Sequence, residues 1–143
     1  MKKIVSSILA LIVLLIVVFL LLFNKETTLK EEGFGGGIEK VSEIEISRVS
    51  GSDEKKINLY DGQAKELFNQ FLNTKLSKVE NVDGEFTESF YIIIRDNEKR
   101  ALGIRIDNTL AFSPYDYNGN SKNNKDYLLE DDSILKSIEQ FFE

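Results

Sequence analysis

The sequence predicts an α+β domain, with helices on one face of an antiparallel sheet, behind an N-terminal transmembrane helix. Three observations support this prediction: an uncharged apolar run near the N-terminus, short segments of alternating apolar and polar residues between turn signals, and two stretches whose apolar residues repeat with helical spacing. Alternation indicates half-buried strands, and spacings of three and four indicate amphipathic helices. The predicted order after the apolar run is β-β-α-β-β-β-α.

The run from Ile4 to Phe23 contains no charged residue. As a helix it would be about 30 Å long, which matches the hydrocarbon thickness of a bilayer. A cleaved signal peptide has a shorter apolar core and a cleavage site of small residues, but this run ends Leu-Leu-Phe-Asn-Lys at 21–25. A buried helix is disfavoured because the remaining chain is too small to surround it. We therefore expect an uncleaved membrane anchor over 1–23.

Basic residues flank both ends of this run, with Lys2 and Lys3 before it and Lys25 and Lys30 after it. The basic pair that directly precedes the run favours a cytoplasmic N-terminus. We therefore expect a single-pass protein of the cell membrane whose C-terminal domain is extracytoplasmic. Residues 24–42 are rich in glycine and charge, which predicts a flexible linker between the anchor and the domain.

The predicted domain covers residues 43–143 and begins with a hairpin. Residues 41–49 and 56–60 alternate, and the turn-forming residues 50–53 join them. The next element is an amphipathic helix that Asp61 can cap. Its apolar residues follow helical spacing and predict one core-facing side: Ala64, Leu67, Phe68, Phe71 and Leu72.

Residues 76–85 are polar and irregular, and a three-stranded meander is predicted after them. Its first strand begins at Phe86, which we expect on the same buried face as Phe90, Ile92 and Ile94. Pro114 ends the meander, and a long polar loop covers 115–126. Residues 128–129 predict either a short strand or an anchor for this loop. A last helix begins at Asp131 or Asp132 and has an apolar face: Ile134, Leu135, Ile138, Phe141 and Phe142.

The chain contains no cysteine and no histidine. Disulfides, the common zinc sites and nucleophiles that need a histidine base are therefore excluded. Removing Lys2 and Lys3 from the 18 basic residues leaves 16 against 24 acidic residues, so the remainder carries a net charge of −8. Because this charge repels nucleic acid, we expect no nucleic-acid partner, and the composition indicates no cofactor.

The loop after the meander partly matches a calcium-binding loop. Asp116, Asn118 and Asn120 occupy ligand positions 1, 3 and 5. Ser121 stands where glycine makes the sharp turn, and Tyr127 stands where a bidentate glutamate is needed. These mismatches favour a solvated loop, and we expect no metal site.

Paired carboxylates are the remaining catalytic chemistry, and Glu85, Glu88 and Asp107 are available near the predicted meander. A small domain with 24 acidic residues produces such pairs by chance. We therefore expect a protein that is not an enzyme, with no catalytic residues. The alternative is a carboxylate-dependent cell-wall hydrolase.

A partner-binding surface is the best functional candidate. Tyrosine and arginine carry interface energy more often than other residues. Alternation places several of them on the predicted sheet face opposite the isoleucines, and others fall in or beside the long loop. The candidate residues are Tyr91, Arg95, Arg105, Tyr115, Tyr117 and Tyr127.

The MKKI start with its apolar run, the composition rich in Lys, Glu, Asn and Ile, and the predicted element order resemble small single-pass extracytoplasmic proteins of low-GC Gram-positive bacteria. The resemblance implies a setting at the cell envelope and no particular activity. We expect a non-enzymatic, membrane-anchored module that binds a protein or peptide partner. A further hypothesis is that Ser6, Ser7 and Ala10 pair the anchor with another membrane helix.

Overall fold

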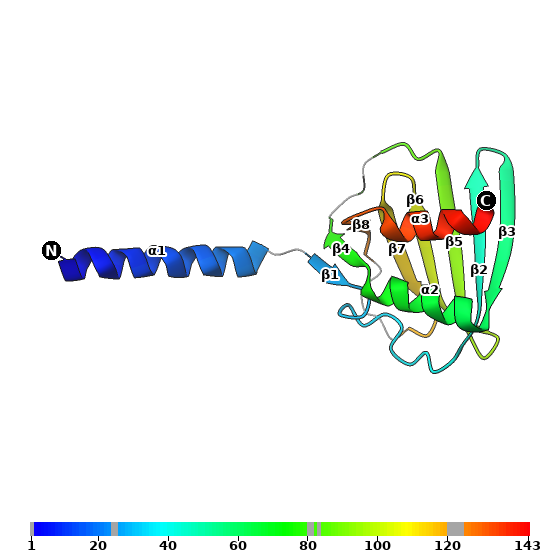
Figure 1. Ribbon diagram of the computed structural model, residues 1–143, viewed down its shortest axis with the longest axis horizontal. Helices are drawn as coiled ribbons and strands as arrows, with labels where there is room; N and C mark the ends of the chain where they lie inside the picture. The colour runs from blue at the N-terminus through cyan, green and yellow to red at the C-terminus, as the bar shows by residue number, and fades with distance from the viewer. Residues whose placement is uncertain (1, 24–25, 80–81, 83, 120–124) are drawn as a thin grey trace.

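The computed structural model describes residues 2–23, 26–79, 82, 84–119 and 125–143 (Figure 1). Within them the order is α1-β1-β2-β3-α2-β4-β5-β6-β7-β8-α3-η1, which confirms the α+β class. The predicted order β-β-α-β-β-β-α is incomplete, because it omits β1 and β4 and leaves β8 open. These strands are β1 (Glu26–Thr28), β4 (Lys75–Lys78) and β8 (Tyr127–Leu129). Strands of three or four residues are too short to show a clear alternation in sequence.

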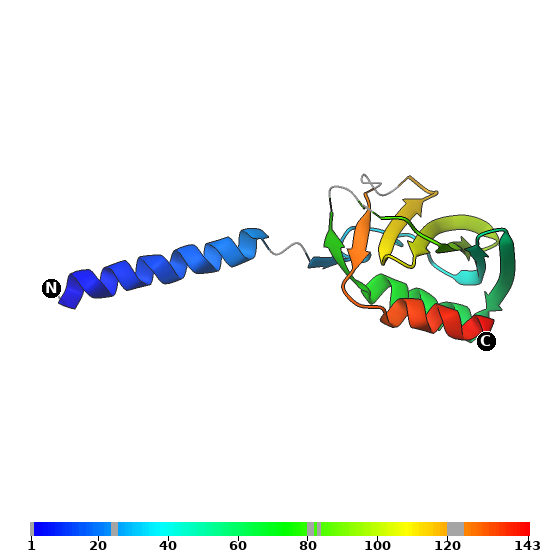
Figure 2. The ribbon, with the colours of Figure 1, turned by 90° about the horizontal axis from the view of Figure 1, so that it is seen from above.

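Helix α1 covers Lys2–Phe23 and extends away from the domain in Figures 1 and 2. Its side chains are described for residues 8–19, and all of these are exposed. In the part of the chain that the structure describes, no helix combines the length and the apolar character needed to cross a membrane. The membrane anchor over 1–23 stays a prediction.

The described strands form one sheet of eight, in the order β1-β4-β8-β7-β6-β5-β2-β3. Every neighbouring pair is antiparallel, as predicted. The predicted hairpin and meander are confirmed as elements, since their alternation defines one apolar face. Pro114 does not end the meander as predicted, because the last strand continues through it to Asp116 and pairs Pro114 with Ile104. The hairpin consists of β2 (Val41–Ser50) and β3 (Asp53–Tyr60), and the meander of β5 (Glu88–Asp96), β6 (Lys99–Asp107) and β7 (Ala111–Asp116).

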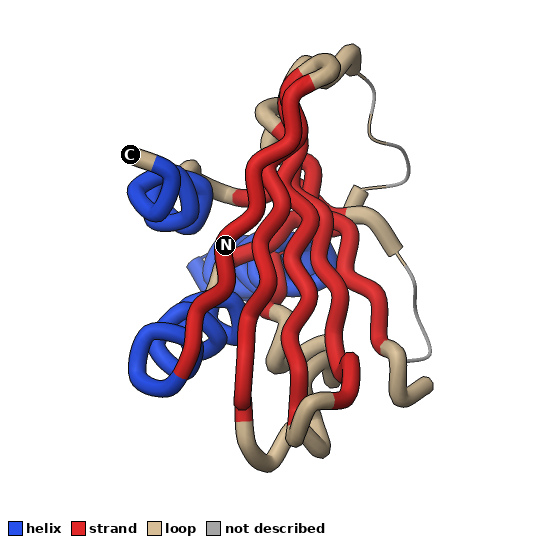
Figure 3. Tube along the Cα trace, turned by 90° about the vertical axis from the view of Figure 1, so that its right-hand side faces the viewer, coloured by secondary structure: helices blue, strands red, loops and turns tan. Residues whose placement is uncertain are grey.

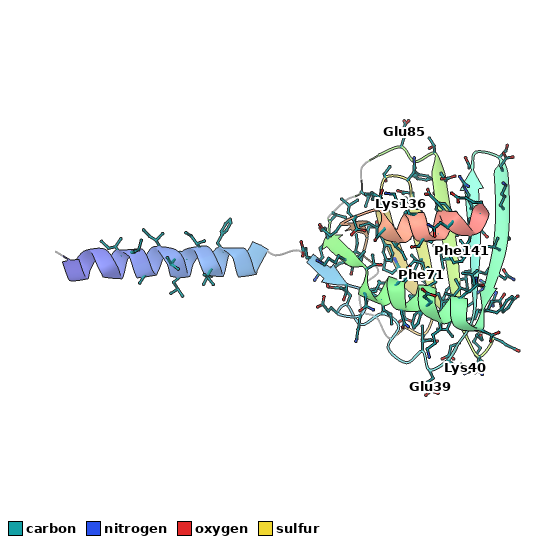
Figure 4. All side chains as sticks on the ribbon, viewed as in Figure 1. Glu39, Lys40, Phe71, Glu85, Lys136 and Phe141 are labelled. Atoms are coloured by element: carbon teal, nitrogen blue, oxygen red, sulfur yellow. The ribbon has the colours of Figure 1, made fainter. Side chains whose placement is uncertain are left out.

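The helices α2 (Asp61–Asn73) and α3 (Ser133–Glu139) lie on the same side of the sheet (Figures 2 and 3). A short 3₁₀ helix, η1 (Gln140–Phe142), continues α3. The core lies between these helices and the sheet, and Phe71 at its centre (labelled in Figure 4) is fully buried. The predicted buried faces are confirmed for Ala64, Leu67, Phe68, Phe71, Ile134, Leu135 and Ile138.

The predicted flexible linker over 24–42 is wrong for the residues after 25, which belong to the domain; residues 24 and 25 lie outside the described part. Strand β1 pairs with β4, with Thr27 opposite Leu76. Leu29 is 0% exposed and Phe34 is 1% exposed, so both belong to the core. The glycines that suggested flexibility instead allow a tight turn. At Gly35, where φ is +75°, a Cβ atom would lie 2.8 Å from the Leu72 side chain.

Candidate functional site

The described helices cover one side of the sheet only, and the opposite side is the candidate site. Alternation along the central strands places a set of residues there, which we call the open face. It comprises Glu43, Glu45, Ser47, Val49, Ser89, Tyr91, Ile93, Arg95, Gly103, Arg105, Asp107, Ser113 and Tyr115, in the registers Ser47–Tyr91–Arg105–Ser113 and Glu45–Ile93–Gly103–Tyr115. These residues come from β2, β5, β6 and β7, which are paired as neighbours in the sheet.

The structure brings five of the six predicted surface residues together on or beside the open face. Tyr91, Tyr115 and Tyr117 are 43%, 51% and 42% exposed. Tyr91 lies directly opposite Arg105 in the ladder between β5 and β6. Exposed aromatic rings on a sheet face that no described helix covers are typical of a binding surface.

Ion pairs hold the two arginines of this surface in place. Arg95 Nη2 lies 3.2 Å from Glu45 Oε2, and Arg95 Nε lies 3.5 Å from Glu43 Oε2. Arg105 Nη2 lies 3.3 Å from Asp107 Oδ2. The guanidinium of Arg105 also stacks on the Phe86 ring, 4.5 Å from the ring centroid. These pairs reduce the free charge that a partner meets on this face.

Gly103 explains how the tyrosines reach the face from the end of β7. A Cβ atom at Gly103 would lie 3.1 Å from Tyr117 Cε2, so the glycine lets this ring lie close over β6, and a larger residue would require the ring to shift by a few tenths of an ångström. The Tyr115 and Tyr117 rings meet edge to face, with their centroids 4.9 Å apart. The aromatic surface therefore continues from β5 across β6 to the end of β7.

The prediction that Tyr127, the sixth residue, lies on the partner surface is wrong, because its side chain is 0% exposed. Its hydroxyl donates a hydrogen bond to Glu32 Oε2 at 3.1 Å. Glu32 Oε1 also accepts a hydrogen bond from Thr27 and lies 2.7 Å from Lys78 Nζ. Strand β8 pairs with β7 and β4 and so places Tyr127 inside the domain. Its role is to fasten the 26–34 segment to the sheet.

The electrostatics of this buried cluster follow from its contacts. Burial by itself would raise the pKa of the Glu32 carboxyl, but hydrogen bonds from Lys78, Thr27 and Tyr127 together hold that pKa below its ordinary value. Burial, followed by the adjacent charge of Glu32 and the hydrogen bond to it, raises the pKa of the Tyr127 hydroxyl well above its ordinary value. The tyrosine therefore stays protonated and donates to an ionised glutamate.

Two of the three carboxylates considered for catalysis, Glu88 and Asp107, have structural partners. Glu88 Oε1 lies 2.6 Å from Arg48 Nε. Asp107 is 2% exposed, and its Oδ1 accepts hydrogen bonds from the backbone N–H groups of Thr109 and Ala111. Glu85 is exposed on the loop before β5. These contacts give Glu88 and Asp107 structural roles.

In the partial calcium-loop match, Asp116 Oδ1 accepts a hydrogen bond from the Asn118 backbone at 2.8 Å. Asn120 and Ser121 lie outside the described residues, and Tyr127 is in the core. Within the described part of the chain, no group of three acidic residues is arranged to hold a metal ion.

Phe86 is a candidate site residue that sequence reasoning missed. It was expected on the buried face with Phe90, but β5 begins only at Glu88 and Phe86 is 47% exposed. The alternation of β5 does not extend to the loop before it, where the chain direction changes. Phe86 lines a pocket of about 560 Å³ with Val49, Ser89 and Tyr91 on the open face. The sequence offered one signal of this exposure: Phe86 is the single apolar residue within the otherwise polar stretch 84–88.

Comparisons with protein-family models, curated proteins and solved structures find no match to this chain.

Proposed function

We propose that this protein is a membrane-anchored, non-enzymatic module on the extracytoplasmic side of the cell membrane, and that its open face binds a protein or peptide partner. The observation that carries this proposal is the uncovered sheet face with three exposed tyrosines held beside paired arginines. Aromatic and arginine side chains supply most interface energy when a partner removes them from water.

The anchor part of the proposal is supported by the uncharged run from Ile4 to Phe23. The described side chains of α1, at 8–19, are all apolar and all exposed. A contiguous apolar surface of this kind requires lipid or protein around it. A bilayer accounts for the helix on every side, whereas a protein partner would cover only part of it.

The short connection to the sheet has a geometric consequence. Only Asn24 and Lys25 separate the bounds of α1 and β1, so the chain reaches no more than about 10 Å between them. Strand β1 is fixed in the sheet by its pairing with β4. With α1 in a bilayer, the β1–β4 edge would lie near the lipid headgroups, and β3 would lie roughly 30 Å farther along the sheet.

This geometry predicts different distances from the lipid surface for two labelled positions. The chain has no cysteine, so Lys75→Cys on β4 and Lys55→Cys on β3 each carry a unique thiol. In lipid nanodiscs, energy transfer from a thiol-linked dye to a headgroup-linked acceptor is expected to be high at position 75 and clearly lower at 55. A Gly-Ser insertion after Lys25 should reduce the difference. Equal transfer at both positions, or recovery of the chain without lipid, would contradict the membrane anchor.

The partner surface is tested by photo-crosslinking in intact cells. A photoreactive amino acid at Tyr91 or Tyr115 is expected to capture the same protein from both positions. The matched controls are Lys65 and Asn69, which are exposed on α2 at the helix-covered side. Adducts that form only from the α2 controls would place the binding surface on the other side of the domain. Release of fragments from cell-wall glycan by the purified chain would instead favour the hydrolase alternative.

A further inference from the structure

A pocket lies at one end of the open face, where the β2–β3 turn meets the start of β5. Its volume is about 560 Å³, within the range of sites that hold small ligands or single side chains. Its lining includes Val49, Gly51, Phe86, Ser89 and Tyr91. Figure 4 labels Glu85, the neighbour of Phe86, at this end of the sheet.

The walls of the pocket are aromatic and exposed. Phe86 is 47% exposed and Tyr91 is 43% exposed, although burial of such rings stabilises a protein. Arg105 stacks on the Phe86 ring and pairs with Asp107, which limits the movement of this wall. Two exposed rings on one pocket provide edges and faces for a third ring.

A second observation points to a ligand. Ser89 lines the pocket and is 3% exposed, and its Oγ has no hydrogen-bond partner among the described residues. A buried hydroxyl without a partner costs about 1–3 kcal/mol. The same rungs of the sheet place Ser89 between Val49 and Asp107, whose carboxylate is already engaged by Thr109, Ala111 and Arg105.

The charged groups at the pocket are paired within the chain. Glu88, which lines it, lies 2.6 Å from Arg48, and Arg105, which stacks on the lining residue Phe86, pairs with Asp107. A charged guest would lose hydration without meeting a free opposite charge. An uncharged aromatic group with one hydrogen-bonding atom matches the rings and the Ser89 hydroxyl together.

We propose that the Phe86–Tyr91 pocket receives a tyrosine side chain of the protein partner, with the phenol hydrogen-bonded to Ser89 Oγ. This inference rests on the proposed function and specifies which partner residue the open face recognises. The guest ring packs against Phe86, which Arg105 holds in place, and rotation of the exposed Tyr91 ring opens the way to the buried Ser89 hydroxyl.

The test uses the full chain in lipid nanodiscs and N-acetyl-3-fluoro-L-tyrosinamide as the probe, observed by ¹⁹F NMR. We expect saturable line broadening that Tyr91→Ala weakens at least about fivefold, because one wall is lost. Tyr60→Ala is the matched control, since Tyr60 is 54% exposed on the edge strand β3. It should leave binding unchanged.

The hydrogen bond is tested with Ser89→Ala and a second probe, N-acetyl-4-fluoro-L-phenylalaninamide. The substitution should weaken binding of the tyrosine probe about 2- to 10-fold and leave binding of the phenylalanine probe unchanged. Three results would overturn the proposal. They are no line broadening of the tyrosine probe with the wild-type chain, equal binding of this probe to the wild type and to Tyr91→Ala, and equal weakening of the binding of both probes by Ser89→Ala. Stronger binding of N-acetylglucosamine at this pocket would overturn it in favour of a glycan.

Failure of this inference is distinguishable from failure of the proposed function. Crosslinks from Tyr91 and Tyr115 without binding of the tyrosine probe would overturn the tyrosine assignment and leave the partner surface in place. If the tyrosine probe binds but crosslinks form only from the α2 controls, the pocket still binds tyrosine but the open face is not the partner surface.

Discussion

Replacing Phe34 with alanine is expected to lower the free energy of unfolding by about 3–5 kcal/mol. Phe34 is 1% exposed and packs in the core, and its backbone N–H donates to the Leu29 carbonyl at 3.0 Å. Removing the ring leaves a cavity beneath the segment that joins β1 to β2. Urea unfolding of the full chain in detergent, followed by tyrosine fluorescence, measures the loss.

Phe86→Ala is the matched control, because Phe86 is 47% exposed and its removal leaves no enclosed cavity. Its cost should be below about 1 kcal/mol. A Phe34→Ala variant as stable as the wild type would mean that the Phe34 ring does not pack in the core, and would support the predicted flexible linker for the glycine-rich part of this segment.

Replacing Asp107 with alanine is expected to cost about 2–4 kcal/mol of stability, because the N–H groups of Thr109 and of the buried Ala111 lose their shared acceptor. Arg105 loses its pairing with Asp107 Oδ2 in the same variant. The same urea experiment measures the change. Thr109 lies in the turn between β6 and β7 and Ala111 is the first residue of β7, so the loss should appear as destabilisation of the whole domain.

Two variants accompany this measurement. Asp107→Asn retains a side-chain oxygen and should cost less than the alanine variant. Asp53→Ala removes an exposed aspartate from the start of β3 and should change stability by less than about 0.5 kcal/mol. An Asp107→Ala variant with unchanged stability would contradict the structural role and return Asp107 to the catalytic candidates.

The central strands could be predicted because their chemistry repeats. In β5 and β6 the buried apolar residues recur at every second position over a long enough run to define a buried face and its register. Helix α2 was predictable for the same reason, since Leu67 and Phe71 recur at helical spacing. From the same alternation, Tyr91 and Arg105 could be placed on the open face before their neighbours were known.

Single residues without a periodic context could not be placed in this way. Phe34 stands among glycines, and Tyr127 follows a polar loop, yet both are in the core. Phe86 precedes β5 and resembles its buried residues, yet it is half exposed. In each case the location depends on the path of the chain outside a regular strand, where the period of two no longer applies.

The amino-acid sequence by itself determined the uncharged N-terminal run, the absence of cysteine and histidine, and which residues of the long strands share a face. These properties depend on residue type and local spacing alone. Only the tertiary structure decided that residues 26–38 belong to the domain, that Tyr127 is buried against Glu32, and that Phe86, Ser89 and Tyr91 line one pocket. These contacts join segments far apart in the chain, and packing of the whole sheet against its helices selects them.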